Sequence, residues 1–267
     1  MKLYEVIDTI NKKYPEYLQY NWDNSGLNIG DKDSEIKKIM LTLEVTESTV
    51  DEAIENNVDL IISHHPFLFS KINKINKNDI KGNLIYKLIS NSISVYCMHT
   101  SYDVAIDGLN DYFFELMGIS NEYILDESCT NENYRNGESY GLGRVGSLEE
   151  TMKVKEFISK LKSKLSIKNV RYVGKLDKKI KTVAVVTGSG AEFFEKAKEL
   201  DIDVLVTGDM KYHQAMDALE IKMSVIDCGH YGTEHIFADS IIGFLIENLK
   251  DIEISKSSNI IDPFTDL

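Results

Sequence analysis

The sequence has little cysteine and no long apolar run. Its three cysteines, Cys97, Cys129 and Cys228, lie far apart, and no Cys-x-x-Cys motif occurs. Neither a disulfide framework nor a cysteine zinc site is indicated, and a reducing compartment, the cytoplasm, is expected. Residues 1–14 have an amphipathic helix pattern without the apolar core of a signal peptide, and no later run approaches the length of a membrane span.

The sequence also lacks an excess of positive charge. Lys and Arg number 30 against 43 Asp and Glu, which gives a net charge of −13 and a pI near 5.0. This charge argues against a protein dedicated to nucleic acid, which needs cations to contact the phosphates. The 267 residues, 43% apolar and 27% charged, are ordinary for a folded protein of one large or two modest domains.

The order of apolar runs predicts alternating strands and helices. The first half reads as strand, helix, strand, helix and strand over residues 36–45, 46–57, 58–63, 80–91 and 93–98, with Thr46 as the cap of the first helix. The second half repeats this order over residues 180–187, 190–200, 202–207, 211–219 and 223–228. Such alternation is typical of mostly parallel sheets covered by helices. We therefore expect an α/β fold made of two related α/β units.

The two halves can be aligned with one another. An offset of 144 residues places Asp203 on Asp59 and Ala197 on Ala53 without a gap. The segments that follow agree at an offset of 131, which sets three residues of one half against three of the other: Cys97, His99 and Asp103 against Cys228, His230 and Glu234. We interpret the chain as a pseudo-repeat whose strand ends face one another across a cleft.

The predicted domains are residues 1–125 and 126–267. Residues 126–140 are polar and rich in turn formers, which makes them the best candidate for a linker. A short strand in GLGRVG, a helix over 147–165, a short strand in NVRYVG and a long helix over 233–250 are expected after it.

A histidine doublet ends one of the buried strands. In DLIISHHPFLF, residues 59–69, an apolar strand stops at His64 and His65, and Pro66 turns the chain away. The carboxyl ends of parallel strands are where α/β sheets bind ligands, so the doublet is a candidate for metal binding. The alternative is a pair of structural histidines that only make hydrogen bonds at a strand end.

Two further pairs place a carboxylate four residues after a histidine. His99 precedes Asp103, and His230 precedes Glu234 at the start of the last helix, so each pair can share a helix face. Imidazoles with carboxylates suit zinc, iron, manganese or nickel, and two ions bridged by a carboxylate fit the number of groups. Either pair alone could equally be structural; their repetition favours metal.

Three other motifs are open to more than one interpretation. TGDMKYH, residues 207–213, offers Asp209 and His213 as ligands, supporting groups or acid–base residues, or as a helix cap and an exposed histidine. TGSGAEFF, residues 187–194, has a two-glycine turn, which is weak evidence for an anion site. WDNSGLNIG, residues 22–30, contains the only Trp and is interpreted as a structural cap, because Trp is usually buried.

These motifs together resemble those of the Nif-three-like dinuclear metal-centre family, also known under the name GTP cyclohydrolase 1 type 2. The matching stretches follow the family's order over nearly the whole chain: WDNSGLNIG, LTLEVTESTVDEAI, DLIISHHPFLF, MHTSYDVAIDGLND, GLGRVG, VVTGSGAEFFEKA, DVLVTGDMKYHQA and DCGHYGTEH. The chain is similar to the family's short form, without an inserted middle domain. One departure is Glu44, where the family usually has aspartate.

The resemblance implies a site, an assembly and a reaction. Two divalent ions would be held by His64, His65, Asp103, His230 and Glu234, with Glu234 bridging. Six copies would form a ring, as a trimer of dimers. The activity would be metal-dependent hydrolysis of a small molecule such as GTP, with Glu234, His99, Asp209 or His213 transferring protons. The alternative is a ring-shaped binding or regulatory protein whose metals serve assembly, sensing or metal homeostasis.

Overall fold

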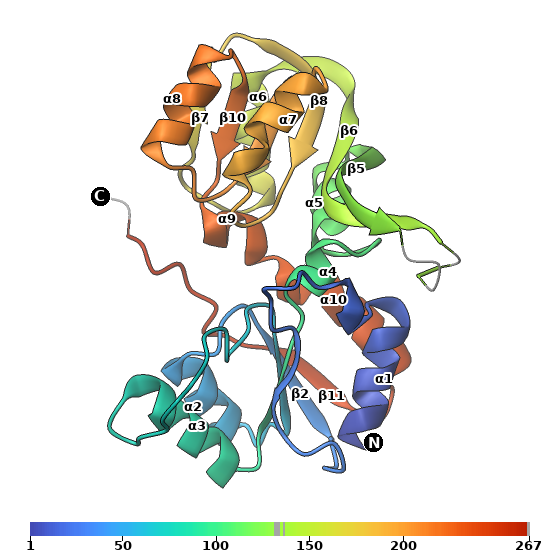
Figure 1. The fold of residues 1–267 in the computed structure, drawn as a ribbon, viewed down its shortest axis with the longest axis vertical. Helices are drawn as coiled ribbons and strands as arrows, with labels where there is room; N and C mark the ends of the chain where they lie inside the picture. Colours follow the sequence, from blue (N-terminus) through green and yellow to red (C-terminus); the bar gives the residue numbers. More distant parts are fainter. Residues whose placement is uncertain (131–133, 136, 266–267) are drawn as a thin grey trace. The chain divides into compact units, whose positions relative to one another are not determined.

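A computed structural model describes residues 1–130, 134–135 and 137–265, which form two compact units (Figure 1). Unit 1 comprises Met1–Tyr102 and Phe237–Ile261, and unit 2 comprises Asp103–Ile236 with the residues from Asp262 onward. This division differs from the predicted domains, because the carboxyl-terminal strand β11 (Glu253–Lys256) pairs in parallel with β2 (Lys38–Thr42) of the first half.

Unit 1 is built on a mostly parallel sheet. Its strand order is β1-β4-β3-β2-β11, with β1 at Gly26–Ile29, β3 at Leu60–Ser63 and β4 at Ser94–Cys97. Strands β2, β3 and β4 run parallel, and β1 pairs with β4 in the antiparallel direction. All residues of β3 and β4 are buried, as expected for strands covered on both faces. The predicted parallel arrangement of this half is confirmed.

Helices cover both faces of that sheet (Figure 1). The helices α2 and α3 lie on one face, and α1 and α10 lie on the other, where Tyr14 contacts Phe244 at 5.4 Å between ring centroids. Thr46 caps α2 as predicted, because its hydroxyl accepts a hydrogen bond from the Thr49 amide at 3.3 Å. The bounds are α1 Leu3–Lys13, η1 Glu16–Leu18, α2 Glu47–Glu55, α3 Ile80–Ser90, α4 Thr100–Asp103 and α10 Phe237–Asn248.

Unit 2 has a second sheet with strand order β5-β6-β8-β9-β10-β7. Strands β8, β9 and β10 are parallel, which confirms the predicted second α/β repeat, whereas β5, β6 and β7 add antiparallel pairs. The strands are β5 Ser120–Thr130, β6 Ser139–Lys153, β7 Arg171–Val173, β8 Lys179–Val185, β9 Val204–Thr207 and β10 Ser224–Asp227. The helical segments are α5 Leu109–Met117, α6 Val154–Lys164, η2 Ala191–Phe193, α7 Phe194–Glu199, α8 Tyr212–Glu220 and α9 His230–Glu234.

The predicted linker is wrong where the structure describes it. Residues 126–130 and 139–140 belong to the β5–β6 hairpin, in which Asp126 lies opposite Leu142; residues 131–133 and 136 fall outside the described residues. The helix predicted from 147 begins only at Val154, because β6 continues to Lys153. An antiparallel ladder joins backbone groups, so a strand with one exposed face can carry the polar composition of a loop.

The repeat is visible in equivalent hydrogen bonds of the two units. Oδ2 of Asp59 accepts from the amides of Lys37 and Lys38 at 2.8 and 2.9 Å. Oδ2 of Asp203 accepts from the amides of Lys181 and Thr182 at 2.7 and 3.1 Å. All three residues of each set are related by the offset of 144. The two aspartates at this offset therefore make the same hydrogen bonds to a neighbouring strand in both units.

The offset of 131 is wrong by one residue within the last strand. Cys97 lies opposite Ser63 in β4, and the equivalent position in β10, opposite Thr207, is Asp227 rather than Cys228. The strands thus align at 130, and one extra residue in the connection restores 131 at the following helices. Gly229, with φ of 73°, lies in that connection, where a left-handed conformation is accessible to glycine.

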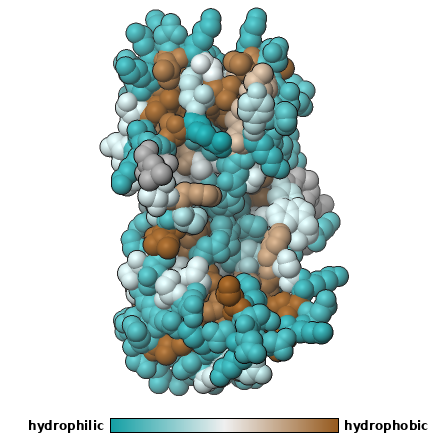
Figure 2. Space-filling model, turned by 90° about the vertical axis from the view of Figure 1, so that its left-hand side faces the viewer, coloured by the Kyte–Doolittle hydropathy of each residue, from teal (hydrophilic) through white to brown (hydrophobic). Residues whose placement is uncertain are grey.

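The surface carries scattered apolar residues. On the face shown in Figure 2, hydrophobic areas are small and separated by hydrophilic side chains. Such scattering is ordinary for protein surfaces. In the part of the chain that the structure describes, no helix has the length and apolar character that a membrane crossing requires.

Glu52 ties the carboxyl-terminal segment to α2, and this contact is expected to weaken in acid. Burial alone raises the pKa of Glu52, but hydrogen bonds from Ser257, Ser258 and Asn259 lower it from 4.5 to about 2. Because the folded pKa is depressed, the stabilisation is present above about pH 4.5 and is lost as the pH falls toward about 2. The difference in melting temperature between wild type and Glu52→Gln should therefore shrink between neutral pH and about pH 2.5. A difference that stays constant would contradict this assignment.

Candidate metal centre

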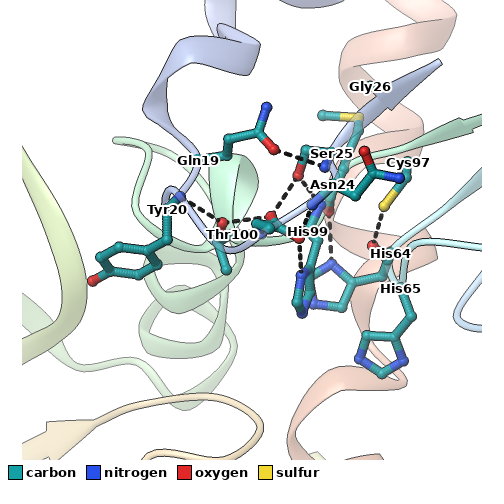
Figure 3. Close-up of polar contacts among 12 residues, drawn as sticks. Gln19, Tyr20, Asn24, Ser25, Gly26, His64, His65, Cys97, His99 and Thr100 are labelled. Atoms are coloured by element: carbon teal, nitrogen blue, oxygen red, sulfur yellow. Dashed lines mark hydrogen bonds and ion pairs between the residues drawn. The ribbon is translucent and has the colours of Figure 1, made fainter. Parts of the chain in front are cut away.

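His64 and His65 leave the carboxyl end of β3 with their rings close together. Both residues are drawn in Figure 3. The ring centroids are 5.1 Å apart, and His64 is fully buried. Nδ1 of His64 lies 2.8 Å from the carbonyl oxygen of Met98, and Nδ1 of His65 lies 2.5 Å from Oε1 of Glu44. The contacts with Met98 and Glu44 therefore fix the orientations of the two imidazole rings at the end of the strand.

His99 follows β4 and belongs to a buried polar network. Its Nδ1 lies 2.7 Å from Oδ1 of Asp23, whose other oxygen accepts from the hydroxyls of Ser25 and Thr100 at 2.8 and 2.5 Å (Figure 3). Burial by itself raises the pKa of Asp23, but the hydrogen bonds and the charge of His99 hold that pKa well below its usual range. Asp23 therefore stays ionised and orients the His99 ring.

His230 and Glu234 occupy the short helix α9 of unit 2. Nε2 of His230 lies 2.8 Å from Oε2 of Glu234, as the four-residue spacing predicts. Nδ1 of His230 lies 2.8 Å from Oδ2 of Asp209, so Asp209 supports this histidine. The Glu234 side chain is only 4% exposed. A carboxylate buried to this degree needs cations or hydrogen-bond donors around it.

Four histidines have Nδ1 facing a carbonyl or carboxylate oxygen, which can only accept. In His64, His65 and His99 this contact places the proton on Nδ1, and in the neutral ring the lone pair then lies on Nε2. Nε2 of His230 also faces a carboxylate, that of Glu234, so the contacts of His230 do not assign a single tautomer. Metal-binding histidines characteristically have one ring nitrogen held by such an oxygen and use the other as the ligand. These contacts belong to His64, His65, His99 and His230.

The turn between β8 and α7 makes room for Glu234. A Cβ added to Gly188, which has φ of 64°, would lie 2.1 Å from Oε1 of Glu234. The Gly188 amide donates to the hydroxyl of Thr233 at 2.8 Å, and the Gly190 amide donates to the hydroxyl of Thr207 at 3.0 Å. Since these amides are used within the protein, the glycines are explained by close packing rather than by an anion.

The remaining predicted residues have different surroundings. Asp103 ends α4 and is buried, and its carbonyl oxygen accepts from Nδ2 of Asn110 at 3.1 Å. His213 is exposed on α8, with its ring beside that of Tyr212 at 5.3 Å. The structure brings His64, His65 and His99 together in unit 1, and Asp209, His230 and Glu234 together in unit 2. The ligand set and the catalytic roles stay predictions.

Sequence reasoning missed Asp23 and misjudged its neighbour Trp22. Asp23 meets His99 across 76 positions of the chain, and no spacing rule signals such a contact. Trp22 is 61% exposed, so the expectation that it is buried as a cap is wrong. Glu44, noted only as a departure from the family, contacts His65 directly.

Comparisons with known proteins identify the family and the fold of the chain. The family model Duf34/NIF3 (NGG1p interacting factor 3) matches residues 1–263. A GTP cyclohydrolase 1 type 2 homolog from Clostridium acetobutylicum is 38% identical over 268 residues, which cover 99% of this chain and 98% of that protein. A Bacillus cereus protein related to NIF3 superposes with a TM-score of 0.94 at 27% identity, over 100% of this chain and 99% of its own. The chain belongs to the Duf34/NIF3 family.

Proposed function

We propose that this protein is a metal-dependent hydrolase with a dinuclear centre. The oxygen contacts on Nδ1 of His64 and His65 carry this proposal, because they direct Nε2 of each ring to act as the ligand atom. His64, His65 and Glu234 supply residue types that could hold one ion. The full proposed ligand set is His64, His65, Asp103, His230 and Glu234, with Glu234 as the bridge.

The donor chemistry fits borderline divalent ions. Imidazole nitrogens combined with carboxylate oxygens suit zinc, iron, manganese or nickel, and availability selects among them. The ions would lower the pKa of a water molecule and polarise the substrate. The protein residues would fix the tautomer of His64, His65 and His99, and Asp23 would stay ionised beside His99.

His99 is the best-placed residue for proton transfer. Asp23 holds the proton on Nδ1, so Nε2 of His99 can accept a proton from water or substrate. Asp209 orients His230, and Glu234 offers a buried carboxylate. The relatives named GTP cyclohydrolase 1 type 2 homolog support GTP as substrate. Opening its imidazole ring requires attack of one water on a ring carbon, which gives a formamide, and attack of a second water on that formamide, which releases formate and leaves an amine.

Metal analysis combined with a formate assay tests this proposal. Protein purified without chelator should contain about two ions per chain and release formate from GTP. The double variant His64→Ala with His65→Ala should contain less metal and release less formate, because two imidazole ligands are removed. His213→Ala, at an exposed histidine outside the ligand set, should leave the metal content unchanged. Metal-loaded protein that hydrolyses a phosphate ester but releases no formate would rule out the cyclohydrolase.

The second candidate is a ring-shaped binding or regulatory protein of the cytoplasm. Tyr212, Met216 and Leu219 of α8 are 72%, 39% and 51% exposed at helical spacing, and such an apolar stripe favours assembly. This function predicts that His65→Ala and Glu234→Ala change the oligomer mass measured by light scattering. A hexamer of unchanged mass with lost turnover would favour the hydrolase.

A further inference from the structure

Three rings surround one point of the surface beside the histidines of unit 1. Trp22 lies 6.0 Å from His99 and 6.2 Å from Phe69, and Phe69 lies 6.4 Å from His99, as distances between ring centroids. All three pairs are edge-to-face, with interplanar angles of 74°, 70° and 86°. We name Trp22, Phe69 and His99 the aromatic box.

Hydrogen bonds between two loops hold the aromatic box in place. Nδ2 of Asn24 donates to the Leu68 carbonyl at 2.6 Å, and the Leu68 amide donates to Oδ1 of Asn28 at 2.9 Å. Nδ2 of Asn28 donates to the Asn24 carbonyl at 3.0 Å, which closes the connection. The segments that carry Trp22 and Phe69 are therefore fixed to each other before any ligand arrives.

Two rings of the aromatic box remain largely exposed, and the third, His99, is 16% exposed. Trp22 and Phe69 are 61% and 56% exposed, although the ring of Tyr20 stacks on Trp22 at 5.7 Å and 13°. Large aromatic side chains are usually more buried, and exposed ones are enriched at binding sites. The contact between His65 and His99, at 5.5 Å between centroids, makes the box continuous with the candidate metal centre.

The adjoining segment supplies positive charge in an acidic protein. Residues 69–81 contain four lysines and one acidic residue, whereas the whole chain has a net charge of −13. Lys81 is anchored there, because its Nζ donates to the Phe67 carbonyl at 2.8 Å and lies 4.1 Å from the centroid of the Phe67 ring. A ligand that joins a flat ring to an anionic group complements both features.

We propose that the aromatic box binds the planar heteroaromatic ring of an anionic substrate, with the ring against Trp22 and Phe69 and the anion toward the lysines of residues 69–81. Stacking on aromatic side chains is tolerant of ring identity, so the box selects a class of ligand, a ring-bearing phosphate ester. The assignment of this ligand as substrate rests on the hydrolase function proposed above.

Trp22 is the only Trp of the chain and therefore reports its own occupancy by fluorescence. Titration with GTP or guanosine should quench this emission saturably, and inorganic triphosphate should not. By equilibrium dialysis, Trp22→Leu should weaken GTP binding about tenfold, and Trp22→Phe should restore most of it, because stacking depends on the ring. The assembly mass of each variant is measured alongside.

The outcomes separate the aromatic box from the hydrolase. Ring-dependent quenching without release of formate or phosphate from GTP would support the box and reject the hydrolase. Formate release with unchanged KM in Trp22→Leu would overturn the box and leave the hydrolase intact. Two fluorescence results would overturn the box: unaltered emission with GTP, or equal quenching by triphosphate. A changed assembly mass in Trp22→Leu with unchanged GTP binding would also overturn it, because the box would then contact a second copy of the chain.

Discussion

Gly188→Ala is expected to lower metal affinity about 10–100-fold, comparable with the loss of a residue that orients a ligand. The new Cβ would lie 2.1 Å from Oε1 of Glu234 and 3.4 Å from Nε2 of His230, so the carboxylate must move. The chain cannot readily retreat, because the Gly188 amide is bound to Thr233. Metal content per chain after dialysis against a weak chelator measures the effect.

Gly118→Ala is the matched control for that substitution. Gly118 also has a left-handed conformation, with φ of 63°, but nothing lies within 4 Å of its added Cβ. Both alanines cost about 1–2 kcal/mol of backbone strain, so a shared loss of stability is expected. Only Gly188→Ala should lose metal. Equal metal content in the two variants would show that the turn does not position Glu234.

Arg144→Met is expected to destabilise unit 2 by about 3–5 kcal/mol, the range for breaking a buried ion pair. Nε and Nη2 of Arg144 lie 2.7 and 2.8 Å from the two carboxylate oxygens of Asp111. Three carbonyl oxygens, of Ala105, Gly141 and Gly143, also accept from this guanidinium at 2.8–2.9 Å. Met fills much of the volume but satisfies none of these acceptors. Urea unfolding measures the loss.

Arg135→Met is the control for the buried arginine. Arg135 pairs with Asp107 at 3.0 Å, but the Asp107 side chain is 57% exposed, so this substitution should cost less than about 1 kcal/mol. A similar cost for both arginines would mean that burial does not strengthen the Arg144 pair. The fold of unit 2 would then not explain the arginine of the GLGRVG motif.

Sequence reasoning succeeded where the physical signal is local. The alternation of buried strands and helices, the Thr46 cap and the His230–Glu234 spacing each depend on residues within a few positions of one another. The repeat at an offset of 144 was also readable, since Asp59 and Asp203 make equivalent hydrogen bonds to the neighbouring strand. These features determined the α/β class and the candidate histidines.

Local signals failed where backbone pairing or exposure decides the outcome. The polar composition of residues 126–130 suggested a linker, but the ladder with β6 makes them a strand. The match of Cys97 with Cys228 ignored one residue in the connection before α9, which only strand register reveals. Trp22 is exposed although its ring contacts Tyr20, Phe69 and His99. The fold decides which residues surround Trp22, and its hydropathy does not predict them.

The sequence by itself determined the fold class, the repeat and the candidate metal-binding residues. Only the tertiary structure decided how those residues are supported. His65 meets Glu44 across 21 positions, His64 meets Met98 across 34, and His99 meets Asp23 across 76. Helical and strand periodicity extends only over neighbouring residues, whereas a hydrogen bond that assigns a histidine tautomer depends on where distant segments meet in the folded chain.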